Sequence, residues 1–502
     1  MNLLGIDAGT SGVKVVLFST DGKEICSSYQ EYSERHPQPG WAEMDAFAIW
    51  EVIKETIHQV AQHPEAANIG ALSISSMGEA VVPVSADRKI LSESILHYDL
   101  RGEEFLEELS QKIDNSALYD LNGNTLGNQY TLTKLLWIKK HQPELYQKTY
   151  KFLHWSGFIA FMLGAEAAVD YSLANRTLLF DLAQEGWSAE LIHAFGLDYE
   201  KLPRTVPSGT AIGKISHEMA QLLDLPEDIV IVSGAHDQCG NAVGCGVIEQ
   251  GNAVFGMGTF LCITPVFVER IATELMAANG LNTEHHAVPG SFVSFLYNQG
   301  GALVKWFRDT FAREEFRAAQ TQGINIYDQL FGELPDQPSS LFIIPQFTTT
   351  GPPEFLSNSS GMISGLQLDT TRGEILKAIL EGVNFYLMAL VESLPGTGIE
   401  IAEYRAVGGG SQSDAWVQLS ADMFGKPFVR PAVTEAGALG AAIMAGVGCG
   451  VFPNYATGVK AMVRLDKTFL PHEEIHNHYQ QRFQQYKQLV SLNADLLNGK
   501  ID

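Results

Sequence analysis

The sequence predicts an α/β protein made of two similar domains. The chain has 502 residues, which is too long for one hydrophobic core. A strand, glycine turn, strand pattern opens the chain, and a second such pattern follows about 250 residues later. Apolar strands alternate with amphipathic helical patterns in between. Glycines cluster at 244–252, so we expect domains at 1–246 and 247–502.

The elements are expected in the following order. The first hairpin has apolar strands on either side of Gly9-Thr10-Ser11-Gly12, and the second has Gly256-Met257-Gly258-Thr259 at its turn. A strand also leads into the glycines at 408–410, and a helix follows it to about residue 424. The other expected elements are strands at 69–75, 80–84 and 229–233, and helices at 46–62, 133–148 and 475–490.

Composition and charge limit the partners. Hydrophobic residues make up 45% and charged residues 18% of the chain, as in ordinary globular enzymes. The net charge of −25 argues against nucleic acid, because binding to a phosphate backbone needs a basic face. It does not exclude ATP, which backbone amides, helix N-termini and Mg²⁺ can hold in an acidic protein.

Features of the sequence also indicate a compartment. The five cysteines show no C-x-x-C spacing, which favours free thiols in a reducing environment. The N-terminal segment lacks a signal-peptide pattern, and no run approaches the roughly 18 apolar residues of a membrane span. We therefore expect a cytoplasmic protein without membrane contact.

The two glycine turns are candidate phosphate-binding loops. Gly9 to Gly12 offer close backbone approach and two hydroxyls, and Lys14 adds a positive charge. Asp7, at the end of the first strand, is placed to hold Mg²⁺ through water. A plain hairpin turn is the alternative for each loop. Two such loops in one chain could together hold a triphosphate.

Two further strand ends carry candidate groups. Gly408-Gly409-Gly410-Ser411 would let a nucleotide lie against bare backbone amides, and tight strand–helix packing is the alternative explanation of these glycines. Asp237, after the apolar strand 229–233, could accept the proton of a substrate hydroxyl. Alternatively, Asp237 caps the following helix, with Gln238 in its first turn. We regard His236 as a packed neighbour.

Polar residues after strand 69–75 are candidates for binding polyhydroxy compounds. Ser75-Ser76-Met77-Gly78-Glu79 and His97-Tyr98-Asp99-Leu100-Arg101 offer carboxylates and other polar groups, and each sugar hydroxyl needs a donor and an acceptor. A surface ion pair is the alternative for Asp99 and Arg101. The histidines at 285–286 and 472–478 lack the partner spacing of a metal site.

Taken together, these residues resemble the FGGY family of carbohydrate kinases. The resemblance runs from GIDAGTSGVK at 5–14 to about residue 450. Its most specific parts are GMISGLQLDTTRGEILKAILE at 361–381 and VGGGSQSDAWVQLSADMFGKPFVRPAVTEAGALGAAIMAG at 407–446. It implies two ribonuclease-H-like domains flanking a central cleft, as in actin, hexokinase and the heat-shock chaperone ATPases.

The resemblance also implies a role for individual residues. Asp237 would be the general base, and Asp7 would hold Mg²⁺, through water. ATP would contact Thr10, Ser11, Lys14, Gly258, Thr259, Gly301, Lys305, Gly409 and Asp414. The sugar would contact Met77, Gly78, Glu79, Asp99, Gln129, Asp237 and Gln238.

Four of these positions depart from the pattern of at least one group of the family. Glycerol kinases carry Arg-Glu at the place of Gly78-Glu79, and xylulose kinases carry Met-His-Gly at the place of Met77-Gly78-Glu79. Gln129 lies outside the family's usual choice, and glycerol kinases have asparagine where Asp414 stands. The missing arginine argues against glycerol, and the missing histidine weakens a simple assignment to xylulose.

The expected function is an ATP- and Mg²⁺-dependent sugar kinase. A ketopentose such as D-xylulose is the first candidate acceptor. L-Fuculose or another ketose, gluconate, and erythritol or a similar polyol are the alternative acceptors. A homodimer also remains open. An actin- or chaperone-like ATPase without a sugar acceptor and a non-catalytic sugar sensor are the rival functions.

Overall fold

The computed structural model describes residues 1–347, 359–433 and 435–497. The chain forms two compact units. Unit 1 contains Met1–Glu249, Asn282–Val293 and Glu435–Arg464, and unit 2 contains Gln250–Leu281, Ser294–Thr434 and Leu465–Asp502. The expected boundary at 246 lies close to the end of the first stretch, and two later segments return to unit 1.

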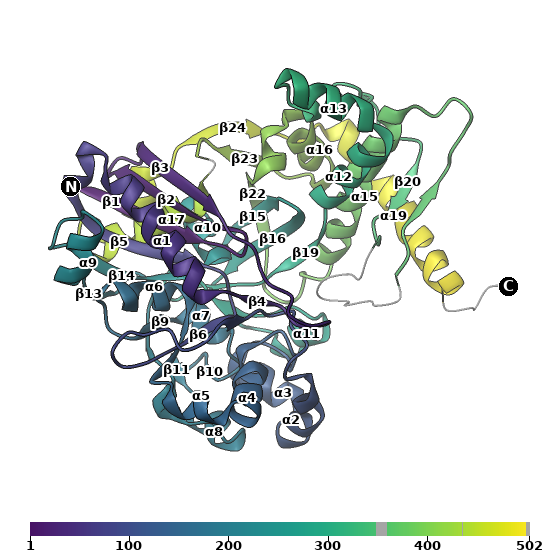
Figure 1. The fold of residues 1–502 in the computed structure, drawn as a ribbon. Helices are drawn as coiled ribbons and strands as arrows, with labels where there is room; N and C mark the ends of the chain where they lie inside the picture. Colours follow the sequence, from purple (N-terminus) through teal and green to yellow (C-terminus); the bar gives the residue numbers. More distant parts are fainter. Residues whose placement is uncertain (348–358, 434, 498–502) are drawn as a thin grey trace. The chain divides into compact units, whose positions relative to one another are not determined.

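Unit 1 is built on a six-stranded sheet with the order β13-β14-β5-β1-β2-β3 (Figure 1). The first hairpin is confirmed, because β1 (Asn2–Ala8) pairs antiparallel with β2 (Gly12–Ser19). On its other side β1 pairs parallel with β5 (Ile69–Ser76), which pairs parallel with β14 (Val230–His236). The carboxyl ends of these three strands therefore meet at one edge of the sheet. The remaining strands of the sheet are β3 (Glu24–Glu31) and β13 (Ala211–Lys214).

Helices cover both faces of this sheet. Alternate residues of β1 point to opposite faces. Leu4 and Ile6 share a buried cluster with residues of α1 (Ala46–Ala61) and α6 (Trp155–Leu163). The other face of β1 packs on α17 (Ala436–Gly448), whose residues are mostly small and almost all buried. A Cβ at Gly5 would lie 1.9 Å from the carbonyl oxygen of Ala438, so glycine is needed for this close approach.

Unit 2 repeats the central pairing of unit 1. The second hairpin is confirmed as β15 (Gly251–Met257) and β16 (Phe260–Phe267), which pair antiparallel. On its other side β15 pairs parallel with β22 (Ile401–Val407). The sheet continues through β23 (Phe428–Pro431) and β24 (Leu465–Phe469), and β19 (Leu296–Gln299) pairs with β16.

The helices agree with the sequence except at one place. The expected helix 133–148 is two helices, α4 (Thr131–His141) and α5 (Pro143–Lys148). Pro143 lacks an amide hydrogen and disfavours helical geometry at Gln142, so the first helix ends there. The helices of unit 2 include α12 (Gly301–Phe311), α15 (Arg372–Val391), α16 (Asp414–Phe424) and α19 (Glu473–Leu497). In the described part of the chain, no helix has the length and apolar character of a membrane span.

Candidate active site

The parallel strands of unit 1 bring the main candidate residues to one edge of the sheet. Ala8 of β1 lies opposite Ser76 of β5, and Ser76 lies opposite His236 of β14. Asp7 is one residue before the end of β1, and Asp237 follows β14 directly. Segments far apart in the sequence thus place two aspartates near each other.

Asp237 is accessible and does not cap a helix. It is the first residue of α10 (Asp237–Gly244), and the N-cap position is held by His236. The side chain of Asp237 is 28% exposed, and one of its oxygens lies 3.1 Å from Nε2 of His236. The alternative that Asp237 is the N-cap is therefore wrong, and its carboxylate is available to a ligand. Gln238 follows in the first turn, as expected.

Asp7 lies in surroundings that favour a cation. Burial and the nearby charge of Asp237 raise the pKa of Asp7 to about 7. Its Oδ1 atom is buried and has no hydrogen-bond partner among the described residues. Gly437 at the start of α17 makes room for this side chain, because a Cβ there would lie 2.3 Å from Oδ2. A hard cation such as Mg²⁺, which takes oxygen ligands, fits the Asp7 carboxylate.

The raised pKa of Asp7 predicts a pH-dependent stability. In metal-free protein, folded Asp7 keeps its proton up to about pH 7, whereas the unfolded chain releases it near pH 4. The free energy of unfolding should therefore fall as the pH rises between these values. Asp7→Asn should remove this fall and be more stable than the parent at pH 8, as measured by urea unfolding. Mg²⁺ should stabilise the parent and not the variant. Parallel pH profiles of the two proteins would contradict this.

The first glycine turn is tight and has an exposed tip. The amide of Gly9 donates a 3.0 Å hydrogen bond to the carbonyl of Gly12. Thr10 and Ser11 are exposed, so their hydroxyls and amides can be reached by a ligand. Lys14 Nζ lies 3.6 Å from a carboxylate oxygen of Glu435. The geometry is compatible with phosphate contacts as well as with a plain turn.

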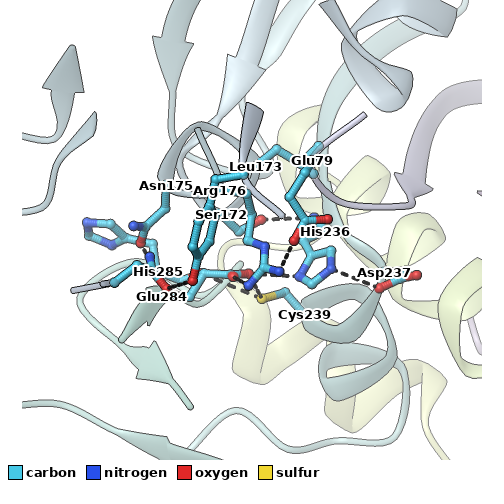
Figure 2. Close-up of polar contacts among 12 residues, drawn as sticks. Glu79, Ser172, Leu173, Asn175, Arg176, His236, Asp237, Cys239, Glu284 and His285 are labelled. Carbon is cyan, nitrogen blue, oxygen red and sulfur yellow. Dashed lines mark hydrogen bonds and ion pairs between the residues drawn. The ribbon is translucent and has the colours of Figure 1, made fainter. Parts of the chain in front are cut away.

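A chain of ionisable side chains, of which Glu79, His236 and Glu284 are buried, leads from Glu79 to Asp237 (Figure 2). Arg176 is paired with Glu79 and, through Nη1, lies 3.2 Å from Glu284. Glu284 accepts a 2.8 Å hydrogen bond from Nδ1 of His236. Since the other ring nitrogen contacts Asp237, the candidate base is linked to Glu79 through three side chains.

The same cluster has ligand atoms that a soft metal ion could use. His236, Cys239 and Glu284 place one such atom each within 4.8 Å of one another. However, His236 and Glu284 already satisfy each other through a hydrogen bond, and Arg176 holds the other oxygen of Glu284. Burial raises the pKa of the Cys239 thiol, which keeps it protonated. We assign no metal to this cluster.

One of the expected sugar contacts, Asp99, has a structural role. The Asp99 carboxylate is fully buried, and Arg101 holds both of its oxygens. It also accepts a 2.6 Å hydrogen bond from the amide of Ala42. The assignment of Asp99 to the sugar is therefore wrong, because no oxygen is exposed to a ligand. The alternative of a surface ion pair is also wrong, since the Arg101 side chain is only 4% exposed.

The remaining expected sugar contacts lie at different depths. Met77 and Glu79 are buried, and Gly78 lies against His236. Gln129 is half-buried in the segment between α3 (Asn115–Asn122) and α4. Glu79 is held by Arg176, so a sugar would meet this carboxylate as part of an ion pair.

In unit 2 the second glycine turn meets the start of α12. The amides of Gly300 and Ala302 donate to the carbonyl of Thr259, and the amide of Gly301 donates to that of Gly258 at 3.0 Å. A Cβ at Gly301 would lie 2.4 Å from the Gly258 oxygen. Gly301 thus supports the turn with its amide, and the expected contact of Gly301 with phosphate stays a prediction. Lys305, one turn later, is exposed.

The third glycine segment lies beside this turn. Gly408 has φ +88° and packs on Met257 at the end of β15, whereas a Cβ at Gly409 would touch nothing within 4 Å. Gly409 therefore borders open space. The helix does not follow directly, because a 3₁₀ turn at Gly409–Gln412 precedes α16.

Asp414, at the start of α16, is not a free carboxylate. Its oxygens lie 2.8 Å from Arg430 and 2.5 Å from Lys467. These contacts lower the pKa of Asp414, the hydrogen bond from Lys467 most of all. A contact between this side chain and adenosine would therefore have to form beside two paired cations.

Comparison with known proteins assigns the chain to a family. The model of the N-terminal domain of the FGGY family of carbohydrate kinases matches residues 2–244, and that of the C-terminal domain matches residues 255–449. The chain belongs to the FGGY family of carbohydrate kinases. It is thus a phosphotransferase, and the family's domains account for its two-part α/β fold.

Individual relatives span the whole kinase. A xylulose kinase of Bacillus subtilis is 26% identical over 500 residues, which cover 98% of this chain and 97% of the relative. An autoinducer-2 kinase of Salmonella typhimurium is 28% identical over 515 residues, which cover 99% and 95%. Among solved structures, the xylulose kinase from Rhodospirillum rubrum has a TM-score of 0.87 at 24% identity, with 99% and 100% covered. This structural likeness shows the fold.

Sequence reasoning missed part of the kinase's site. Arg176 and Glu284 were not singled out, and His236 was set aside as a packed neighbour. Arg176 and Glu284 are separated by 108 residues in the chain, so only the fold brings them together. The position of His236 next to Asp237 was the one available signal in the sequence.

Proposed function

We propose that this kinase transfers the γ-phosphate of ATP to a hydroxyl of a small sugar, with Asp237 as the general base. The accessible carboxylate of Asp237 at the end of β14 carries the proposal. The acceptor oxygen attacks the γ-phosphorus, the bond from phosphorus to the β,γ-bridging oxygen breaks, and ADP leaves. The proton of the hydroxyl passes to Asp237.

Other groups serve the phosphates in this proposal. Mg²⁺, held by Asp7, would neutralise charge on the phosphate oxygens. The exposure of the turn Thr10-Ser11 and the positive charge of Lys14 support phosphate contacts from unit 1. In unit 2 the turn Gly258-Thr259 and the open space at Gly409 support a site for ATP.

A ketopentose such as D-xylulose is the first candidate acceptor. Full-length similarity to xylulose kinases supports it, but similarity to autoinducer-2 kinases is as high. Gly78 stands where xylulose kinases carry histidine, so the acceptor pocket differs from theirs. Other ketoses, autoinducer-2, gluconate and erythritol belong in the same comparison.

An acceptor screen tests the proposal. Purified kinase with ATP and Mg²⁺ is offered pentuloses, hexuloses, aldonates, polyols and autoinducer-2, and ADP release is followed by a coupled assay. We expect ADP release that depends on one acceptor class. ADP release that is equal with and without acceptor would point to an ATPase. Acceptor binding without any ADP release would point to a sugar sensor, and either result would contradict the proposal.

A further inference from the structure

Gly78 leaves a side-chain space that His236 and Arg176 border. A Cβ at Gly78 would lie 3.3 Å from Nε2 of His236 and 3.7 Å from Nε of Arg176. The φ of Gly78 is not in the left-handed region, so its backbone conformation does not require glycine. Glycine therefore matters at this position because it has no side chain to crowd His236 and Arg176.

The ring of His236 is fixed on both sides. Nδ1 lies 2.8 Å from Glu284, and Nε2 lies 3.1 Å from Asp237. The backbone amide of His236 is also bound, to Oγ of Ser172 at 2.9 Å.

Acidic and basic side chains alternate along this chain. Glu79, Glu284 and Asp237 are carboxylates, and Arg176 and His236 lie between them. Because the three carboxylates outnumber the two basic side chains, the chain carries a net negative charge in either form of His236. Water is largely excluded here, because the side chains of Arg176 and His236 are only 16% and 8% exposed. Charge repulsion at such a site is screened less than at the surface.

We propose that His236 is a positioning residue for Asp237, and that His236 and Arg176, beside the space left by Gly78, select a neutral polyhydroxy acceptor over an aldonate. This inference rests on the proposed function. His236 holds one carboxylate oxygen of Asp237 and so leaves the other for the acceptor hydroxyl. An aldonate would bring a further negative charge to this chain of charged side chains, which already has a net negative charge. The basic side chains of the chain are already paired with its own carboxylates.

The variant His236→Gln tests the positioning role. It removes the imidazole ring beside Asp237 and one of the two ring contacts. We expect kcat with the best neutral acceptor to fall by about 10- to 100-fold, because a misplaced catalytic group costs on this order. The KM for ATP should change less than threefold. A merely structural role would lower the amount of folded protein and leave kcat per folded molecule unchanged.

His286→Gln provides a matched control. His286 is also buried, and its Nε2 lies 3.0 Å from the carbonyl of Val247, with no contact to Asp237. We expect the control to lower the melting temperature without changing kcat per folded molecule. Equal kcat values for His236→Gln and the control would overturn the positioning role.

A swap of residues tests the space at Gly78. Gly78→His should lower kcat/KM for the neutral acceptor at least tenfold, because its side chain needs the volume that the His236 ring holds. The double variant Gly78→His with His236→Gly should regain at least tenfold of that loss. If Gly78→His is fully active, or if the double variant is no better than Gly78→His, the proposed arrangement is wrong.

Charge selection is tested with Glu79→Gln. This change removes one carboxylate, so the chain of charged side chains loses one negative charge. We expect the ratio of kcat/KM for gluconate to that for the best neutral acceptor to rise at least tenfold. An unchanged ratio, or a parent kinase that prefers gluconate, would overturn this part. If no acceptor stimulates ADP release by the parent kinase, the proposed function itself fails, which is a different result.

Discussion

Asp237→Asn is expected to lower kcat about 10²- to 10⁴-fold, the usual contribution of a general base. The amide keeps the size of the side chain but cannot take the proton of the acceptor hydroxyl. Asp237→Ala should have an effect of the same order. The dissociation constant of ATP, measured by calorimetry, should change little, because Asp237 is assigned to the acceptor hydroxyl.

The surface variant Asp228→Asn is a suitable control for this experiment. The Asp228 side chain is 93% exposed and pairs with Lys214 at 2.9 Å. The control variant therefore removes the same charge as Asp237→Asn, but away from the site. We expect it to keep the parent kcat. An Asp237→Asn variant that keeps more than a tenth of the parent kcat would contradict the role of Asp237 as base.

Local signals in the sequence were sufficient to predict the centre of each unit. Glycine turns between short apolar strands identified both hairpins, since such turns dictate chain reversal wherever they occur. The strand before Asp237 was found because it is apolar and ends in a glycine. The break between α4 and α5 was missed although Pro143 marks it, because the amphipathic pattern continues on both sides of the proline.

The sequence predicted the two aspartates but not the side chains that surround them. Asp7 and Asp237 stand at strand ends, where α/β proteins place functional groups. The partners of His236 come from distant segments, and Glu284 lies in a short stretch that returns to unit 1. For Asp99 and Arg101 the sequence suggested polar groups within reach of a ligand or of solvent, whereas the two side chains form a buried ion pair. The spacing of two charged residues does not reveal whether their ion pair is buried.

The contact between α10 and α17 connects this kinase's packing to its site. Glycines line the contact, and a Cβ at Gly440 would lie 2.0 Å from the carbonyl oxygen of Gly240. At Gly244 the corresponding distance, to the Ala436 oxygen, is 1.8 Å. Asp237 begins α10, and α17 begins beside Asp7, so the separation of these helices fixes the positions of both carboxylates.

Gly440→Ala is expected to destabilise unit 1 by about 3 kcal/mol or more, at the upper end of what overpacking costs. In an exposed helix the same change would stabilise by about 1 kcal/mol, since alanine is the better helix former. The sign of the effect therefore reports the close contact. Urea unfolding followed by circular dichroism measures it, and Gly186→Ala, whose Cβ would meet its nearest atom at 3.7 Å, is the control. A stabilised Gly440→Ala variant would mean that α10 and α17 lie farther apart, and that Asp7 and Asp237 are not held by this helix pair.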